Sequence, residues 1–337
     1  MEVKMRIIRL TKESRKNLLG DLLQRSPNYY GQYEKTVADI VEQVRNRGDE
    51  ALFSYTKQFD GCDLTPETVR VTKEEIERAC AQADPDFLKV MEESAENIRR
   101  FHEKQLRNSW FDARPDGTIL GMKILPLAVA GVYKIIMTTP PGPDGQVDPG
   151  TLAAARVAGV DEIYRVGGAQ AIAAMAFGTE SVPRVDKITG PGNIFVALAK
   201  RACFGYVSID SIAGPSEILV IADDTANPRY VAADLLSQAE HDELASAILI
   251  TTSERMAKEV SEQVDGFLET LSRREIIQKS LDRYGYILLA DSLEEAAEAA
   301  DEIASEHLEI LTENPFELMT KIRNAGAIFL GEYSSEP

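Results

Sequence analysis

The chain has 337 residues, which is enough for about two domains of ordinary size and a sizeable buried core. It carries 37 Lys and Arg against 55 Asp and Glu, a formal net charge of −18, and this charge repels phosphate backbones and anionic lipid headgroups. A composition of 44% hydrophobic and 27% charged residues is typical of a globular protein rather than a disordered one. We therefore expect no nucleic-acid partner and no membrane partner.

The cysteines and the apolar segments indicate a cellular location. Cys62, Cys80 and Cys203 are odd in number and form no C-x-x-C pair, which argues against a disulfide framework and favours a reducing compartment. The longest mostly apolar run, residues 124–133, is half of the roughly 20 residues that a membrane-spanning helix needs. The first residues also lack the apolar core of a signal peptide. We expect a cytoplasmic protein.

The first hundred residues read as helical. Apolar residues recur at helical spacing over 35–59 and are interrupted at Arg47–Gly48–Asp49, which predicts two amphipathic helices. Residues 72–101 repeat this character, and Thr72 followed by Glu75 has the spacing of a capping box. We find no chemical motif in this part of the chain.

After Pro126 the pattern changes to short β-branched or aromatic runs that alternate with alanine-rich helical stretches. This alternation predicts mostly parallel sheets with helices on both faces, which is a doubly wound α/β fold. The strands that we expect are Tyr133–Thr138, Glu162–Val166, Val185–Thr189, Glu217–Ala222, Ala247–Thr251, Tyr286–Ala290 and Ala327–Leu330.

Two of these strands run into glycine turns that open helices, at 166–170 and 189–193. Backbone N–H groups at a helix start favour an anion, and glycine lets a pyrophosphate approach the main chain. Asn193 also suits a helix N-cap. Neither turn is a G-x-G-x-x-G motif, because Phe195 stands where the third glycine would be, so tight packing of a βα turn is the simpler interpretation on spacing alone. A third loop, 212–217, leaves the Ser216 hydroxyl at the edge of a strand.

The chain contains three histidines, and His102 lies in a charged helical segment where an exposed, structural role is expected. Gln238 and His241 lie three residues apart near the end of a predicted helix, so their side chains could hold one metal ion. The helix dipole alone would also explain a histidine at this place. A structural zinc site would need four Cys or His ligands, which the chain does not offer.

The third histidine, His307, follows Glu306 directly. The pair leaves a predicted helix over 293–304 and enters the apolar–polar alternation Leu308–Glu309–Ile310. Adjacent acid and imidazole groups at a strand entrance suit paired general acid–base catalysis if that edge lines a cleft. An ordinary exposed pair is the alternative.

Taken together, these motifs resemble the histidinol dehydrogenase family, and the resemblance runs from about Val37 to Pro337. It is carried by the segments RGDEALFSYTKQFDG, DEIYRVGGAQAIAAMAFGTESVPRVDKITGPGN, IDSIAGPSEILVIADDTANPRYVAADLLSQAEHD, SEHLEI and NAGAIFLGEYSSEP. The resemblance implies a homodimeric, zinc- and NAD-dependent enzyme of histidine biosynthesis. Such an enzyme oxidises L-histidinol to L-histidine through an aldehyde, in two hydride transfers.

The resemblance also implies roles for individual residues. Glu306 and His307 match the catalytic acid–base pair, in which His307 takes protons from the alcohol and Glu306 activates the water that hydrates the aldehyde. The remaining matches are Gln238 and His241 as zinc ligands, Ser216 as a substrate contact, and Gln170 and Asn193 as NAD contacts. Because ligands of wound sheets bind beyond the carboxyl ends of the strands, we expect all these side chains to meet there, in one cleft between two domains.

The resemblance further suggests a domain division. We expect an N-terminal helical segment over 1–25, a first Rossmann-like domain formed by 26–127 and 217–337, and a second Rossmann-like domain over 128–216. The swapped C-terminal domain of the family has no counterpart in this sequence.

The sequence departs from the family at two places. Leu127 runs directly into Ala128 where the family has a tyrosine and a glycine loop, and the family continues past the position of Pro337 with further zinc ligands. We therefore keep open a second hypothesis, a shortened homologue or partial chain that dimerises or binds ligand without dehydrogenase activity. A third, weaker hypothesis takes the glycine turns as a site for a phosphate-bearing ligand in a transferase.

Overall fold

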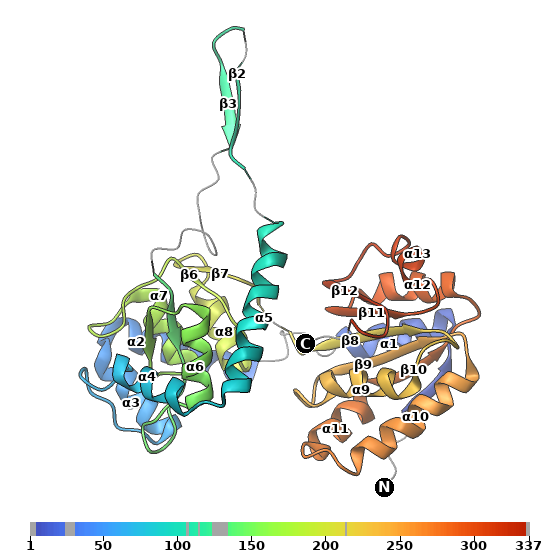
Figure 1. The fold of residues 1–337 in the computed structure, drawn as a ribbon, viewed down its shortest axis with the longest axis horizontal. Helices are drawn as coiled ribbons and strands as arrows, with labels where there is room; N and C mark the ends of the chain where they lie inside the picture. The colour runs from blue at the N-terminus through green and yellow to red at the C-terminus, as the bar shows by residue number, and fades with distance from the viewer. Residues whose placement is uncertain are drawn as a thin grey trace. The chain divides into compact units, whose positions relative to one another are not determined.

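The computed structural model describes residues 5–23, 31–105, 108–113, 115–122, 134–212 and 214–334. The chain divides into two compact units. Unit 1 comprises residues 1–31 and 213–337, and unit 2 comprises residues 32–212. Figure 1 shows the elements of both units, and each unit is described by itself below.

Unit 1 is built on one six-stranded parallel sheet with the strand order β1-β10-β9-β8-β11-β12. The chain winds outward from β8 through β9 and β10 on one side, and β11 and β12 extend the sheet on the other side. The strands are β1 (Arg6–Arg9), β8 (Glu217–Ala222), β9 (Ser246–Thr251), β10 (Gly285–Leu289), β11 (His307–Leu311) and β12 (Ala327–Leu330). The helices are α1 (Lys12–Leu23), α9 (Pro228–Ala239), α10 (Glu254–Leu268), α11 (Arg274–Tyr284), α12 (Leu293–Ile303) and α13 (Pro315–Met319).

Helices cover both faces of this sheet (Figure 1). Ile218 and Val220 pack with α9, α10 and α11 on one face, and Leu219 and Ile221 pack with α1, α12 and α13 on the other. A strand buried on both faces must be apolar at every position, which explains the continuous run EILVIA in β8. The α/β class with a parallel sheet is confirmed, and β8 and β12 have the bounds that the sequence predicts.

Unit 2 is mainly helical. Its helices are α2 (Gly31–Arg47), α3 (Asp49–Asp60), α4 (Lys73–Gln82), α5 (Pro85–Glu103), α6 (Pro149–Ala158), α7 (Gly168–Phe177) and α8 (Ile194–Cys203). Its strands are β2 (Trp110–Ala113), β3 (Ile119–Met122), β4 (Ile136–Thr138), β5 (Glu162–Tyr164), β6 (Lys187–Ile188) and β7 (Ser208–Ile209). The predicted helix break at Gly48 is confirmed, and so is the Thr72–Glu75 capping box.

The strands of unit 2 form small sheets. Strand β4 pairs with β5, and β6 with β7, each in parallel, whereas β2 and β3 form an antiparallel hairpin. Every residue of β2 and β3 is exposed, including the apolar Trp110, Phe111, Ile119, Leu120 and Met122. In neither unit does a helix among the described residues have the length and apolar character needed to cross a bilayer.

The observed units differ from the expected domains. Residues 26–127 were expected to fold with 217–337, but residues 32–127 group with 128–212, where α4 packs on α6 and α3 on α7. The N-terminal segment is not only helical, because β1 joins the sheet of unit 1 beside β10. Among the described residues, unit 2 holds two separate parallel strand pairs rather than one wound sheet. The junction Leu127–Ala128 lies outside the described residues.

Candidate functional site

Five of the predicted site residues belong to the amino edge of the sheet of unit 1. Ser216 immediately precedes β8, and its carbonyl oxygen accepts a hydrogen bond of 3.0 Å from the N–H of Ser246, the first residue of β9. His307 is the first residue of β11. Helix α9 connects two neighbouring parallel strands, so the chain at its C-terminal end, with Gln238 and His241, returns to the edge where β9 begins.

This location corrects the expectation that all the site residues follow the carboxyl ends of strands. Ser216, Glu306 and His307 lie where the chain enters β8 and β11, because each precedes or opens its strand rather than following it. Gln170 and Asn193 do follow the strands β5 and β6, in unit 2.

Strand register places His307 on the α9 side of the sheet, beside the entrance of β8 where Ser216 lies. His307 pairs with Ile218 in the parallel ladder, and registered neighbours direct their side chains to one face. Ile218 packs in the core on the α9 face, and Ser216 lies two residues before it. Gln238 is in the last turn of α9 and only 2% exposed. The amino edge of the sheet therefore carries a hydroxyl, an amide and an imidazole.

The two expected zinc ligands have different surroundings. Helix α9 ends at Ala239, and His241 lies in the following turn, where its N–H donates to the carbonyl of Gln238 over 3.1 Å. Gln238 is buried, whereas His241 is exposed. The expectation that both side chains project from the helix is thus wrong for His241, although the turn keeps the two residues adjacent.

The Glu306–His307 pair is fixed through its backbone. The Glu306 carbonyl accepts from the N–H of Ala327 over 2.9 Å, and the Ser305 hydroxyl donates to the His307 carbonyl over 2.9 Å. The His307 ring lies 6.1 Å from the ring of Phe329, centre to centre. Glu306 is exposed and His307 is half-buried. The Glu306 carboxylate is therefore open to solvent, while the His307 imidazole lies beside the ring of Phe329.

Sequence reasoning missed a pair of acidic residues, Asp234 and Glu309, near this site. Glu309, two residues after His307 on the same face, is 1% exposed, and its side chain hydrogen-bonds to Asp234 on α9. Burial raises the pKa of Asp234 above its usual value, although the bond to Glu309 acts in the opposite direction. Because a hydrogen bond between two carboxyl groups needs a proton, the pair holds one. The available signal was a Glu within the apolar strand sequence HLEIL.

In unit 2 the expected NAD contacts lie in the first turns of helices. Gln170 is buried in the first turn of α7, close behind β5. Asn193 is the N-cap of α8, as expected, and its Oδ1 accepts from the N–H groups of Phe195 and Val196 over 3.1 and 3.2 Å. Asn193 is exposed, so it can meet a ligand while its oxygen caps the helix.

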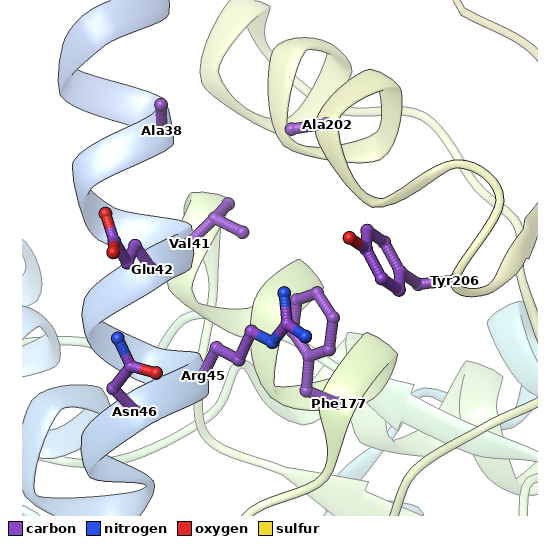
Figure 2. Close-up of a pocket in the computed structure, with 8 residues that line it drawn as sticks. All are labelled: Ala38, Val41, Glu42, Arg45, Asn46, Phe177, Ala202 and Tyr206. Atoms are coloured by element: carbon purple, nitrogen blue, oxygen red, sulfur yellow. The ribbon is translucent and has the colours of Figure 1, made fainter.

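A surface hollow in unit 2 holds none of the expected site residues. Its volume is about 380 Å³, and Figure 2 shows its lining residues, Ala38, Val41, Glu42, Arg45, Asn46, Phe177, Ala202 and Tyr206. The guanidinium of Arg45 lies 5.0 Å from the ring centres of both Phe177 and Tyr206. The hollow offers no acid–base pair suited to dehydrogenation, so we do not assign the reaction to it.

The donors on the described residues do not complete a zinc site. In that part of the chain, no three His, Cys, Asp or Glu side chains are gathered so that they could hold a metal ion. Gln238 and His241 supply two donors, whereas zinc in proteins takes three or four protein ligands.

The chain matches one family over most of its length. The family model described as histidinol dehydrogenase matches residues 23–133 and 120–337. Histidinol dehydrogenase from Halalkalibacterium halodurans is 55% identical over 329 residues, which cover 90% of this chain and 77% of that protein. The Bacillus subtilis (strain 168) enzyme is 50% identical, with 90% and 76% covered. The crystal structure of histidinol dehydrogenase from Elizabethkingia anophelis has a TM-score of 0.86 at 33% identity, covering 98% of this chain and 81% of that one.

The matches also bear on the junction at Leu127–Ala128. The family model matches in two segments that overlap at residues 120–133. The alignment with the H. halodurans protein runs over 329 residues although 90% of this 337-residue chain takes part, so it has more positions than the chain fills. The overlap of the two family-model segments agrees with an interruption of the family pattern near this junction. The identity on either side is high enough that this chain is a member of the histidinol dehydrogenase family.

Proposed function

We propose that this chain oxidises L-histidinol to L-histidine with NAD, through an aldehyde, in two hydride transfers. The observation that carries the proposal is that Ser216, Gln238 and His307 all lie at the amino edge of the sheet of unit 1. Side chains that could hold the substrate thus lie at the same edge as an imidazole that could move its protons. The family membership supplies the reaction that suits this set.

The acid–base pair would act in succession. His307 takes the proton of the substrate hydroxyl as the first hydride leaves, and Ser216 holds the substrate in place. As Glu306, which is open to solvent, takes a proton from the water that adds to the aldehyde, His307 returns its proton to the aldehyde oxygen, which completes the hydrate. The hydrate loses the second hydride while the neutral His307 takes a hydroxyl proton again, and the resulting carboxylic acid releases its proton to solvent to become the carboxylate.

The cofactors are also part of the proposal. NAD, when bound, supplies the hydride acceptor, and Gln170 and Asn193 would contact it beside the two glycine turns of unit 2. The fit rests on the open space around Gly190, where an added Cβ would meet no atom within 4 Å. Gln238 and His241 would contribute to a zinc site. Because these two donors fill only part of a zinc shell, no step is assigned to the metal.

We further propose that the chain forms a cytoplasmic homodimer and that unit 1, whose parallel sheet is covered by helices on both faces, is a doubly wound, Rossmann-like domain. The three cysteines are free thiols, which suits a reducing compartment. The β2–β3 hairpin exposes five large apolar side chains, and a two-stranded hairpin is marginally stable without a surface to pack on. A second copy of the chain would provide such a surface.

Variants at the acid–base pair test the proposal. We expect H307N to lower kcat for histidinol-dependent NAD reduction by roughly 10²- to 10⁴-fold, the usual contribution of general acid–base catalysis. E306Q should slow oxidation of the aldehyde more than that of the alcohol. The control is H102N, because His102 is exposed at the end of α5 and contacts the Gln105 side chain over 3.0 Å. Wild-type activity of H307N would refute the assignment.

A further inference from the structure

One ion pair, between the buried Lys200 and the partly exposed Asp210, holds both backbone polar groups of Gly190, the first glycine of the turn before α8. The Lys200 ammonium donates to the Gly190 carbonyl and, over 2.8 Å, to Oδ1 of Asp210. The other carboxylate oxygen, Oδ2 of Asp210, accepts from the N–H of Gly190 over 2.8 Å. The turn is thus fixed by a closed ring of three residues.

The elements of unit 2 explain how this ring forms. Lys200 lies about two turns into α8, the helix that the glycine turn opens, and its side chain returns to the turn. Asp210 directly follows β7, and its N–H donates to the carbonyl of Ile188 in β6 over 3.2 Å. The pair therefore ties the turn to the end of its own strand and to its own helix.

The buried charge of Lys200 is stabilised by its hydrogen-bond partners in the ring. Lys200 is only 4% exposed, and burying an ammonium is costly unless it is paired and hydrogen-bonded. Burial alone would raise the pKa of Asp210, but hydrogen bonds from Lys200 and from the Gly190 and Ser211 N–H groups hold it below its usual value. The carboxylate thus stays charged and keeps the ring closed.

The opposite side of Gly190 is open. Its φ of 123° is a conformation that side chains rarely adopt, and an added Cβ would meet no atom within 4 Å. Glycine is therefore required here by the backbone angle and not by packing. The turn is locked on one side and leaves its Cα accessible on the other, which suits close approach of a ligand.

We propose that Lys200 and Asp210 are positioning residues of the cofactor site, holding the Gly190 turn in the conformation that binds NAD. This inference rests on the proposed NAD site. Neither side chain needs to touch the cofactor, because both act through the backbone of Gly190. Their loss should weaken NAD binding more than it slows the chemical step at saturating NAD.

Titration of NAD into the full chain by calorimetry, together with kinetics, tests this role. We expect K200M to raise the Kd and KM for NAD about tenfold, since it removes two hydrogen bonds from a charged donor. The kcat should stay within about threefold of the wild-type value, because the side chains that act in the transition state are unchanged. K200R, which keeps a cation, should recover part of the affinity. Asp210 is partly exposed, so its charge can be hydrated in K200M.

The matched control is D49N. Asp49 is also buried in unit 2, where it accepts from the N–H and hydroxyl of Ser181, so its loss should lower the thermal stability without changing the Kd for NAD. A folded K200M with wild-type affinity would overturn the inference, and if K200M does not fold, wild-type affinity of D210N would do so. An unmutated chain that fails to bind NAD would instead refute the proposed cofactor itself, and the inference with it.

Discussion

Gly326 offers a precise way to disturb the acid–base pair without replacing it. A Cβ added at this position would lie 2.6 Å from the Glu306 carbonyl oxygen and 3.3 Å from the Glu306 Cα, which are backbone atoms that cannot rotate away. The N–H of Gly326 also donates to the Ser305 carbonyl over 3.1 Å. The substitution G326A must therefore push the entrance of β12 away from the backbone of Glu306 and His307.

The size of the effect follows from this distance. A normal van der Waals contact between carbon and oxygen exceeds 2.6 Å by several tenths of an ångström to about 1 Å. The backbone segments at Gly326 and Glu306 must therefore move apart by about that much. Overpacking of this kind costs about 1–3 kcal/mol of stability. A displacement of about 1 Å at reacting groups can lower the rate about 100-fold. We expect G326A to remain folded and to lose about one to two orders of magnitude in kcat.

The assay compares G326A with G266A. Gly266 lies in α10 of the same unit, and an added Cβ there meets no atom within 4 Å. G266A should raise the unfolding free energy by about 1 kcal/mol, the difference in helix propensity, and leave kcat unchanged. Thermal unfolding and NAD reduction are measured for both variants. A G326A protein with wild-type kcat would refute the reasoning that the β11–β12 contact fixes the acid–base pair.

Three further predictions follow from the described residues. Calorimetric titration of the 337-residue chain should show weak or no zinc binding, because Gln238 and His241 leave most of the shell to water, and tight stoichiometric binding would prove this wrong. Burial raises the pKa of the Cys203 thiol to about 11, so iodoacetamide should modify the partly exposed Cys80 first in the native protein, and equal rates would contradict this. Burial raises the pKa of Asp234, so the wild-type protein loses stability as pH rises from the unfolded pKa through the folded one, whereas D234N does not. Urea unfolding over a pH series should show the unfolding free energy of D234N rising relative to that of the wild type across this pH range. A difference in unfolding free energy that does not change with pH would rule the mechanism out.

Local patterns in the sequence predicted the structure correctly where local interactions determine it. The capping box at Thr72 and the N-cap at Asn193 depend on residues two or three positions apart, and both are present. Strand β8 is apolar from Ile218 to Ala222 because it is central in the sheet, so its extent can be read from the sequence pattern. Local patterns also singled out the segments that hold the seven expected site residues, whereas the role of each residue was inferred from the resemblance.

The features of the fold that the sequence did not predict depend on contacts between residues far apart in the chain. Strand β1 is only RIIR, with charged ends, and it forms because β10 offers a partner 280 residues away in the chain, a pairing that no local sequence pattern reveals. The grouping of 32–127 with 128–212 likewise depends on tertiary packing. The Asp234–Glu309 pair was missed because a charged residue in a strand is usually read as facing solvent.

The central claim is that this chain carries out both oxidation steps on histidinol, and the ratio of products tests it most directly. Purified protein is incubated with limiting L-histidinol and excess NAD until the reaction ends, and NADH and histidine are both quantified. We expect two NADH and one histidine for each histidinol consumed, with no aldehyde remaining. Absence of histidinol-dependent NADH, or one NADH per histidinol with aldehyde accumulating, would contradict this claim.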